Sequence, residues 1–132
     1  MTDRSEKAIQ NDTLVALSAE PDTLVWRNNT GQAWQGQRIE RPIGSTVKIE
    51  PGMVILRNAR PVTFGLPGSP DIIGVSGGIP LGDEIKTLTG RQAQMQRNFQ
   101  ARWEQCGGLY LLSRSPEEAV QALRQAKEQR KL

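Results

Sequence analysis

Histidine is absent from this chain of 132 residues. Without it, neither a Ser-His-Asp nor a Cys-His nucleophile can form, and no histidine can serve as the general base of a nuclease. The single cysteine, Cys106, excludes an internal disulfide, and one cysteine without histidine cannot complete an ordinary four-ligand zinc site. Any metal would therefore be held by oxygen, the ligand atom that magnesium and manganese prefer.

Long apolar runs and aromatic residues are also scarce. No apolar stretch reaches about 18 residues, which argues against a transmembrane helix, and the polar N-terminus argues against a secretory signal. Hydrophobic residues make up 36% of the chain and aromatic residues 5%, which is enough for one modest core. We expect one cytoplasmic domain over residues 1–132, frayed at about 1–4 and 128–132, with Cys106 as a small packed residue.

Charge is distributed unevenly along the chain. Residues 1–90 carry nine Lys/Arg and ten Asp/Glu, a net charge of −1. Residues 91–132 carry eight against four, a net charge of +4. A basic C-terminal third is suited to a polyanionic partner, although a solvated lysine and arginine surface would have the same composition.

Hydrophobic periodicity and turn residues predict the order helix, several strands, helix, strand, helix. The helices are expected at 4–17, 91–105 and 117–128, the last with Ser115 as its N-cap and Pro116 at its first position. Strands are expected at 23–28, as short segments within 32–64 with turns at 42–44 and 51–52, on both sides of Gly77-Gly78, and at 109–112. This order predicts an α/β or α+β domain with a central mixed β-sheet flanked by helices.

The hairpin around Gly77-Gly78 contains the most informative residues. If these glycines form a two-residue loop, counting outward along both strands brings Asp71 opposite Glu84. Like charges placed that way repel, unless a divalent cation lies between them. Alternation puts Lys86 on the same face as Glu84, where its ammonium group can hold a water or an anionic oxygen. Two acids and a lysine around such a metal are typical of phosphodiester cleavage.

Two further residues of the hairpin region bear on this register. Pro80 indicates an edge or bulged position in the second strand. Asp83 faces away from Glu84 by alternation, so we expect its carboxylate to be solvated or hydrogen-bonded; in a slipped register it would contact the metal instead. On the following helix, Met95, Phe99 and Trp103 have a four-residue spacing that predicts core positions.

Several motifs in this order resemble the VRR-NUC family, a branch of the PD-(D/E)XK nuclease superfamily. The motifs are Ser5-Glu6-Lys7-Ala8-Ile9-Gln10, Val25-Trp26-Arg27-Asn28-Asn29-Thr30-Gly31, Arg57-Asn58-Ala59-Arg60-Pro61, Phe64-Gly65-Leu66-Pro67-Gly68-Ser69-Pro70-Asp71-Ile72-Ile73-Gly74, Glu84-Ile85-Lys86-Thr87, Thr89-Gly90-Arg91 and Gln96-Arg97-Asn98-Phe99. The resemblance covers nearly the whole chain and implies a restriction-endonuclease-like core.

The resemblance also implies roles for individual residues. Asp71 and Glu84 would bind Mg²⁺ or Mn²⁺, with the Ile85 backbone carbonyl completing the protein ligands. Lys86 would orient the attacking water and stabilise charge on the phosphate. Glu6 matches an acidic position near the metal, and Gln96 matches a polar position on the helix behind the active site.

Candidate DNA contacts fall into two groups. The side chains of Arg27, Asn28 and Thr30 flank a loop whose donors could hold phosphates. Arg57, Arg60 and Arg91 lie close to the acidic hairpin in the sequence. A turn fixed by asparagines, or a solvated basic surface, would have the same residues.

Together these features predict a metal-dependent DNA endonuclease with no organic cofactor. By the resemblance, the protein would be a phage or bacterial homodimer that cleaves branched DNA, such as four-way junctions, in DNA repair. Flap cleavage stays open, as does a non-catalytic DNA-binding protein that keeps the nuclease fold. A nucleotide-binding module is disfavoured, because the glycines follow no phosphate-loop spacing.

Overall fold

The computed structural model describes residues 4–40, 44, 46, 48 and 50–131. It divides the chain into two compact units, which we describe separately: a sheet unit, Met1–Asn29 with Gly65–Leu132, and a ribbon unit, Thr30–Phe64. The single-domain expectation therefore stays a prediction. Within this described part, no helix is both long and apolar enough to cross a membrane.

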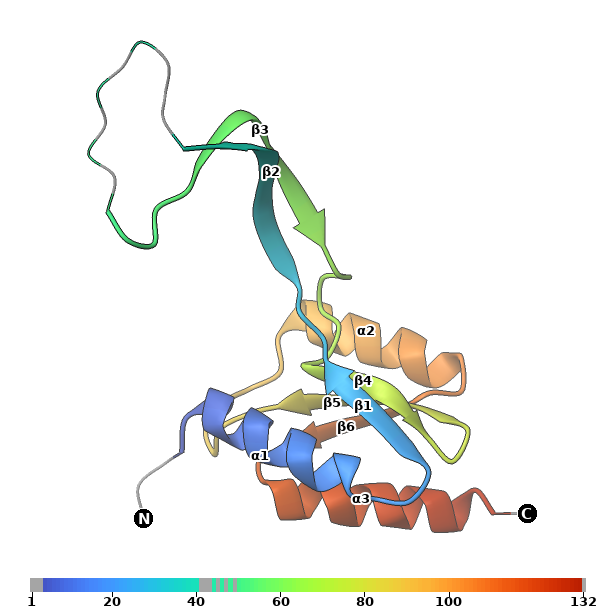
Figure 1. Ribbon diagram of the computed structural model, residues 1–132. Helices are drawn as coiled ribbons and strands as arrows, with labels where there is room; N and C mark the ends of the chain where they lie inside the picture. Colours follow the sequence, from blue (N-terminus) through green and yellow to red (C-terminus); the bar gives the residue numbers. More distant parts are fainter. Residues whose placement is uncertain (1–3, 41–43, 45, 47, 49, 132) are drawn as a thin grey trace. The chain divides into compact units, whose positions relative to one another are not determined.

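The sheet unit contains four strands and three helices (Figure 1). In chain order they are α1 (Glu6–Ser18), β1 (Thr23–Arg27), β4 (Ile72–Ser76), β5 (Ile79–Ile85), α2 (Gln94–Gln105), β6 (Leu109–Ser113) and α3 (Pro116–Gln129). The strands lie in the order β1-β4-β5-β6. The first two neighbouring pairs are antiparallel, whereas β6 runs parallel to β5. The predicted mixed sheet flanked by helices is thus confirmed.

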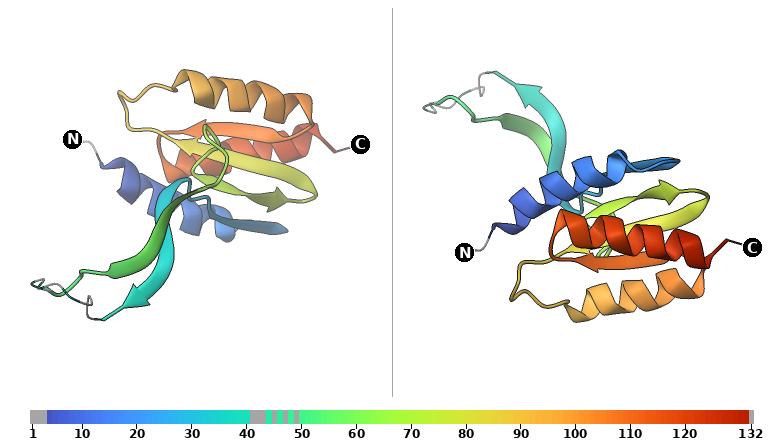
Figure 2. Two further views of the ribbon diagram at one scale, coloured as in Figure 1. Left: turned by 90° about the horizontal axis from the view of Figure 1, so that it is seen from above. Right: turned by 90° about the horizontal axis from the view of Figure 1, so that it is seen from below.

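Helices cover both faces of this sheet, with α1 and α3 on one face and α2 on the other (Figure 2). Alternation along β5 assigns its side chains to the two faces. Leu81 and Ile85 join α1 and α3 in the hydrophobic core, which also includes Leu17 and Leu123. The intervening residues of β5, among them Glu84, point toward α2. The face that carries Glu84 is therefore opposite the main core.

Short-range signals position the ends of these elements. Ser5 caps α1 by accepting a hydrogen bond from the Ala8 amide, so this helix begins at Glu6. Ser115 caps α3 in the same way, as predicted. Gly77 and Gly78 have φ angles of 54° and 80°, which a two-residue hairpin turn requires and glycine readily adopts.

The ribbon unit is a two-stranded antiparallel hairpin of β2 (Gly31–Ile39) and β3 (Ile55–Phe64). The prediction of several short strands in 32–64 is therefore wrong, because two long strands pair along the segment. The predicted turn at Pro51-Gly52 is confirmed. In the other predicted turn, 42–44, positions 42 and 43 lie outside the described residues.

Four expectations for the C-terminal third are corrected. Helix α2 begins at Gln94, so positions 91–93 are not helical, and none of its residues is buried. Met95 is exposed and Phe99 and Trp103 are only half-buried, so they are not core residues, because all three line an open hollow beside α2. Cys106 is exposed rather than packed, because it follows the last turn of that helix. At the C-terminus, α3 continues through Gln129, so positions 128 and 129 are helical.

Candidate metal centre

Asp71 and Glu84 meet at the open end of the β4–β5 hairpin. The ladder that starts at the Gly77-Gly78 turn ends with the pair Ile72 and Asp83. One further step in the same register places Asp71 beside Glu84. The predicted register is therefore confirmed over the whole length of the ladder.

Pro80 does not disturb this register, although it lies inside β5. It is paired with Val75 of β4, next to the pair that closes the hairpin. In a two-residue hairpin this second pair is not hydrogen-bonded, so the nitrogen of Pro80 points away from β4. On the other side, β6 begins to pair only at Leu81. The missing N–H group thus costs no ladder hydrogen bond, which fits the predicted edge position.

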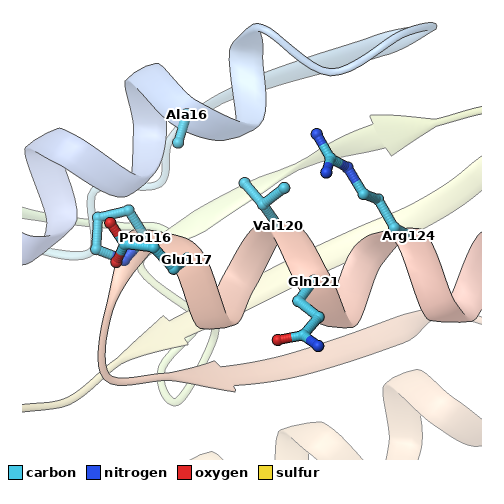
Figure 3. Close-up of a pocket in the computed structure, with 6 residues that line it drawn as sticks. All are labelled: Ala16, Pro116, Glu117, Val120, Gln121 and Arg124. Carbon is cyan, nitrogen blue, oxygen red and sulfur yellow. The ribbon is translucent and has the colours of Figure 1, made fainter.

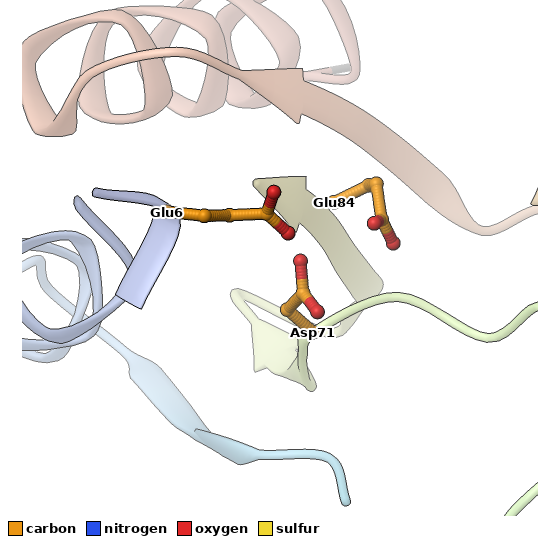
Figure 4. Close-up of side chains that lie close together, drawn as sticks. All are labelled: Glu6, Asp71 and Glu84. Carbon is orange, nitrogen blue, oxygen red and sulfur yellow. The ribbon is translucent and has the colours of Figure 1, made fainter. Parts of the chain in front are cut away.

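Three carboxylates converge beside this hairpin end (Figure 4). One oxygen from each of Glu6, Asp71 and Glu84 lies within 4.8 Å of the others. Glu6 is exposed on the first turn of α1, Asp71 is half-buried, and Glu84 is only 2% exposed. The fold therefore brings together an acidic cluster that the sequence spreads over 79 positions. We refer to these three residues as the acidic cluster.

The two oxygens of Glu84 have different environments. Oε1 accepts a hydrogen bond of 2.8 Å from Nε2 of Gln96 and lies 3.3 Å from Nζ of Lys86. Oε2 is buried and has no hydrogen-bond partner among the described residues. Burial and the nearby charge of Asp71 raise the pKa of the Glu84 carboxyl well above its ordinary value, against the lowering effect of Lys86.

Asp71 is held in place by backbone and side-chain contacts. Its Oδ2 accepts a 2.8 Å hydrogen bond from the backbone amide of Ile85, the residue whose carbonyl is a predicted ligand. The backbone amide of Asn28 donates to the Asp71 carbonyl at 2.8 Å. The Asn28 side chain also donates to Ser69 Oγ at 2.7 Å and to the Pro70 carbonyl at 2.9 Å. Asn28 therefore positions the chain before Asp71, and both of its amide hydrogens are used within the protein rather than free for DNA.

Gln96 connects the start of α2 to the acidic cluster. Its Oε1 accepts a 2.8 Å hydrogen bond from the backbone amide of Ala93, and its Nε2 donates to Glu84. The same side chain thus caps the helix and holds a carboxylate. The predicted position of Gln96 behind the site agrees with these contacts.

Asp83 differs from its expected environment. It faces the core side of β5, as alternation predicts, but it is completely buried and not solvated. Neither carboxylate oxygen has a hydrogen-bond partner within the part of the chain described. Burial raises the pKa of Asp83 to about 7, and the nearby charges of Asp71 and Glu118 add to this rise. The α1 and α3 layer covers this face of the strand, which a single-sequence pattern does not reveal.

The remaining predicted DNA contacts are not part of the acidic cluster. Arg27 is exposed at the end of β1 and donates a hydrogen bond to Asn11 of α1. Arg91 is exposed in the segment between β5 and α2. Thr30, Arg57 and Arg60 belong to the ribbon unit, and all three are exposed.

Arg114 is a positioning residue that sequence reasoning missed. It follows β6 and is half-buried. Its guanidinium donates hydrogen bonds to the Thr87 carbonyl and, at 2.8 Å, to the Gly90 carbonyl. These bonds hold the turn that follows Lys86. No local motif indicates this role, because its partners are 24 and 27 positions away in the sequence.

Two surface hollows of the sheet unit lie outside the acidic cluster. One lies between α1 and α3, where Arg124 and Val120 line it (Figure 3). The other, of about 480 Å³, lies between α2 and the loop before β4 and is lined mainly by Leu66, Met95, Phe99 and Trp103. Neither contains a predicted catalytic or metal-binding residue.

No protein-family model matches the chain, and no curated protein is significantly similar to it. The VRR-NUC resemblance therefore stays a prediction.

Proposed function

We propose that the protein is a metal-dependent DNA endonuclease of the PD-(D/E)XK type, related to the VRR-NUC branch. The observation that carries this proposal is the acidic cluster with Lys86 beside it. The cluster has a buried Glu84 oxygen without a hydrogen-bond partner among the described residues. A buried carboxylate oxygen in that condition is unfavourable unless a cation or another partner is present.

The donor set fits a divalent cation of the magnesium type. All candidate ligand atoms are oxygens, which Mg²⁺ and Mn²⁺ prefer. Asp71 and Glu84 would hold the ion, with Glu6 at its exposed side and the Ile85 carbonyl completing the set. A cation would also relieve the repulsion between the carboxylates, which adds to the effect of burial in raising the pKa of Glu84.

Each residue around the centre has a distinct task in phosphodiester hydrolysis. The bound ion would supply Lewis acidity that activates water and polarises the phosphate. Lys86, only 9% exposed, would direct its ammonium hydrogens toward the attacking water and stabilise the negative charge that develops on phosphate oxygens. The side chain of Gln96 holds the carboxylate of Glu84 in a fixed orientation. The backbone amide of Ile85 does the same for the carboxylate of Asp71.

We propose branched DNA as the substrate, four-way junctions in particular, and a homodimer as the active form. In the proposed reaction, a water oxygen bonds to phosphorus and the bond from phosphorus to the 3′-oxygen breaks. The leaving 3′-oxygen takes a proton, so the products carry a 5′-phosphate and a 3′-hydroxyl. A two-fold dimer would present two centres to two strands of one junction.

A cleavage panel tests this proposal. Purified protein is incubated with labelled four-way junctions, flaps, splayed arms and duplexes, in Mg²⁺, in Mn²⁺ and in EDTA. Cleavage of junctions that requires the metal and is lost in Asp71→Asn supports the proposal. Cleavage of flaps alone would correct the substrate. DNA binding without any cleavage, together with no Mn²⁺ binding by calorimetry, would favour a non-catalytic DNA-binding protein instead.

A further inference from the structure

The β2–β3 ribbon exposes both of its faces to solvent. Neither strand contains a buried residue, and only Ile39, Ile55, Leu56 and Val62 are half-buried. An isolated two-stranded ribbon is only marginally stable in water, so contact with a partner would stabilise it. The two strands carry three arginines (Arg38, Arg57 and Arg60) and no acidic residue. The ribbon is therefore a strongly cationic surface.

A β-bulge places two of these arginines on one face. Arg57 and Arg60 are three positions apart, so a regular strand would point them to opposite faces. Here Arg60 is paired with Gln35 and Arg57 with Gln37, with the register shift between these pairs. Gln35 and Gln37 are two positions apart on β2, so they share a face. Their directly opposed arginine partners lie on that same face.

Backbone geometry maintains the bulge. Asn58 adopts a φ of 54°, a conformation that asparagine tolerates better than most residues. On the facing strand, a side chain at Gly36 would come within 3.0 Å of the Arg57 carbonyl oxygen and 3.1 Å of the Ala59 Cα. Glycine at position 36 therefore allows the two strands to approach at the bulge. We call the side chains of Gln35, Gln37, Arg57 and Arg60 the Arg-Gln face.

The Arg-Gln face has the chemistry of a DNA-reading surface. Neither arginine forms an ion pair with any residue that the structure describes, and Arg60 donates to Gln35 Oε1 at 3.2 Å. Arginine binds phosphates and the O6 and N7 atoms of guanine, and glutamine binds the N6 and N7 atoms of adenine. The major groove of B-DNA admits a two-stranded β-ribbon.

We propose that the β2–β3 ribbon binds duplex DNA, with its Arg-Gln face in the major groove. This inference rests on the proposed function only for the choice of DNA as the nucleic acid. The charge complementarity between the two arginine-bearing strands, which contain no acidic residue, and the phosphate backbone favours DNA as the occupant. A second copy of the chain is the competing occupant, and the experiment separates the two.

The test compares the double variant Arg57→Gln, Arg60→Gln with wild type and with Arg38→Gln. Arg38 is paired with Leu56 and lies on the opposite face, so it is a matched control for the removal of charge. Binding of a fluorescein-labelled duplex is measured by anisotropy in EDTA, which prevents cleavage, over a series of salt concentrations. The double variant is expected to bind about tenfold or more weakly. Its slope of log affinity against log salt should fall by about 0.9 for each phosphate that the variant no longer neutralises.

Each result decides the inference. Duplex affinity of the double variant within twofold of wild type overturns it, and so does an equal reduction of affinity per charge in Arg38→Gln. Sedimentation velocity provides a third check: a change in oligomeric state with unchanged DNA affinity would assign the ribbon to contacts between copies. Mn²⁺ calorimetry on wild type and Asp71→Asn tests the metal centre separately. Failure of the inference that the ribbon binds DNA can therefore be distinguished from failure of the nuclease proposal.

Discussion

Gln96 on α2 donates a hydrogen bond of 2.8 Å to Oε1 of Glu84 on β5. The Gln96 amide oxygen is occupied by the Ala93 backbone amide, so the orientation of the whole side chain is determined by the helix start. Oε1 of Glu84 is thus engaged, while Oε2 stays available to a ligand. A residue that caps a helix therefore also positions the most buried carboxylate of the acidic cluster.

Gln96→Ala is expected to weaken Mn²⁺ binding about tenfold, because outer residues that orient metal ligands typically contribute that much. Calorimetric titration measures the affinity, and thermal unfolding establishes that the variant is folded. Asn98→Ala, on an exposed position of the same helix, should bind metal as wild type does. An unchanged metal affinity in Gln96→Ala would show that Gln96 only caps the helix.

Lys86→Ala is expected to reduce DNA cleavage by a factor of about 100 to 1000, because it removes a buried cation from beside the reacting phosphate. Metal binding should persist, since the carboxylates remain. Single-turnover cleavage of a labelled junction and Mn²⁺ calorimetry separate the two effects. Lys7→Ala, an exposed lysine on α1, is the matched control. Cleavage by Lys86→Ala at the wild-type rate would remove Lys86 from the mechanism.

Asn28→Ala is expected to lower the free energy of unfolding by about 1–3 kcal/mol, because it removes two hydrogen bonds and leaves the Pro70 carbonyl without this donor. Urea unfolding measures this change. Asn29→Ala, at the neighbouring exposed position, should change stability little. Equal effects at both positions would argue against the positioning role of Asn28.

The Glu20–Arg124 pair predicts a pH-dependent contribution to stability. The hydrogen bond from Arg124 lowers the pKa of Glu20 below its ordinary value of 4.5. A lowered folded-state pKa stabilises the fold above the ordinary value, and this stabilisation is lost as pH falls through the lowered pKa. Arg124→Gln should therefore be less stable than wild type at pH 7 but equally stable in strong acid.

Urea unfolding over a pH series measures this difference. Arg91→Gln also removes one exposed positive charge, but Arg91 forms no ion pair with any residue in the described ranges. The stability of the Arg91→Gln variant should therefore depend on pH as that of wild type does. A difference between wild type and Arg124→Gln that persists in strong acid would mean that packing of the arginine stem, not the charge, stabilises the fold.

Helix and turn signals that act over a few residues are predictable from the sequence. Ser115 and Pro116 indicate the start of α3, and Gly77-Gly78 indicates the turn that pairs β4 with β5. In each case the partner atoms are at most four positions away, so residue type and spacing are sufficient. The same turn then determines the Asp71–Glu84 register, because no bulge interrupts the pairing between β4 and β5.

The burial of a side chain is harder to predict from the sequence than its place on a helix or strand. Met95, Phe99 and Trp103 have core spacing, yet Met95 is exposed and the other two line an open hollow. The pattern predicts a solvated or hydrogen-bonded Asp83, yet this residue is completely buried. A periodic pattern identifies which residues share a face, but it does not say what covers that face.

The identities of the acids, the lysine and the hairpin turn are thus encoded locally, because alternation and turn geometry depend on neighbouring residues. The tertiary fold alone brings Glu6 from α1 and Gln96 from α2 to the end of the hairpin. These residues are too far from Glu84 in the sequence for turn geometry or alternation to predict the contacts. It also assigns Asn28 and Arg114 to the support of that end. Pairing across the ribbon places Arg57 and Arg60 on one face, because the bulge offsets the alternation that their spacing predicts.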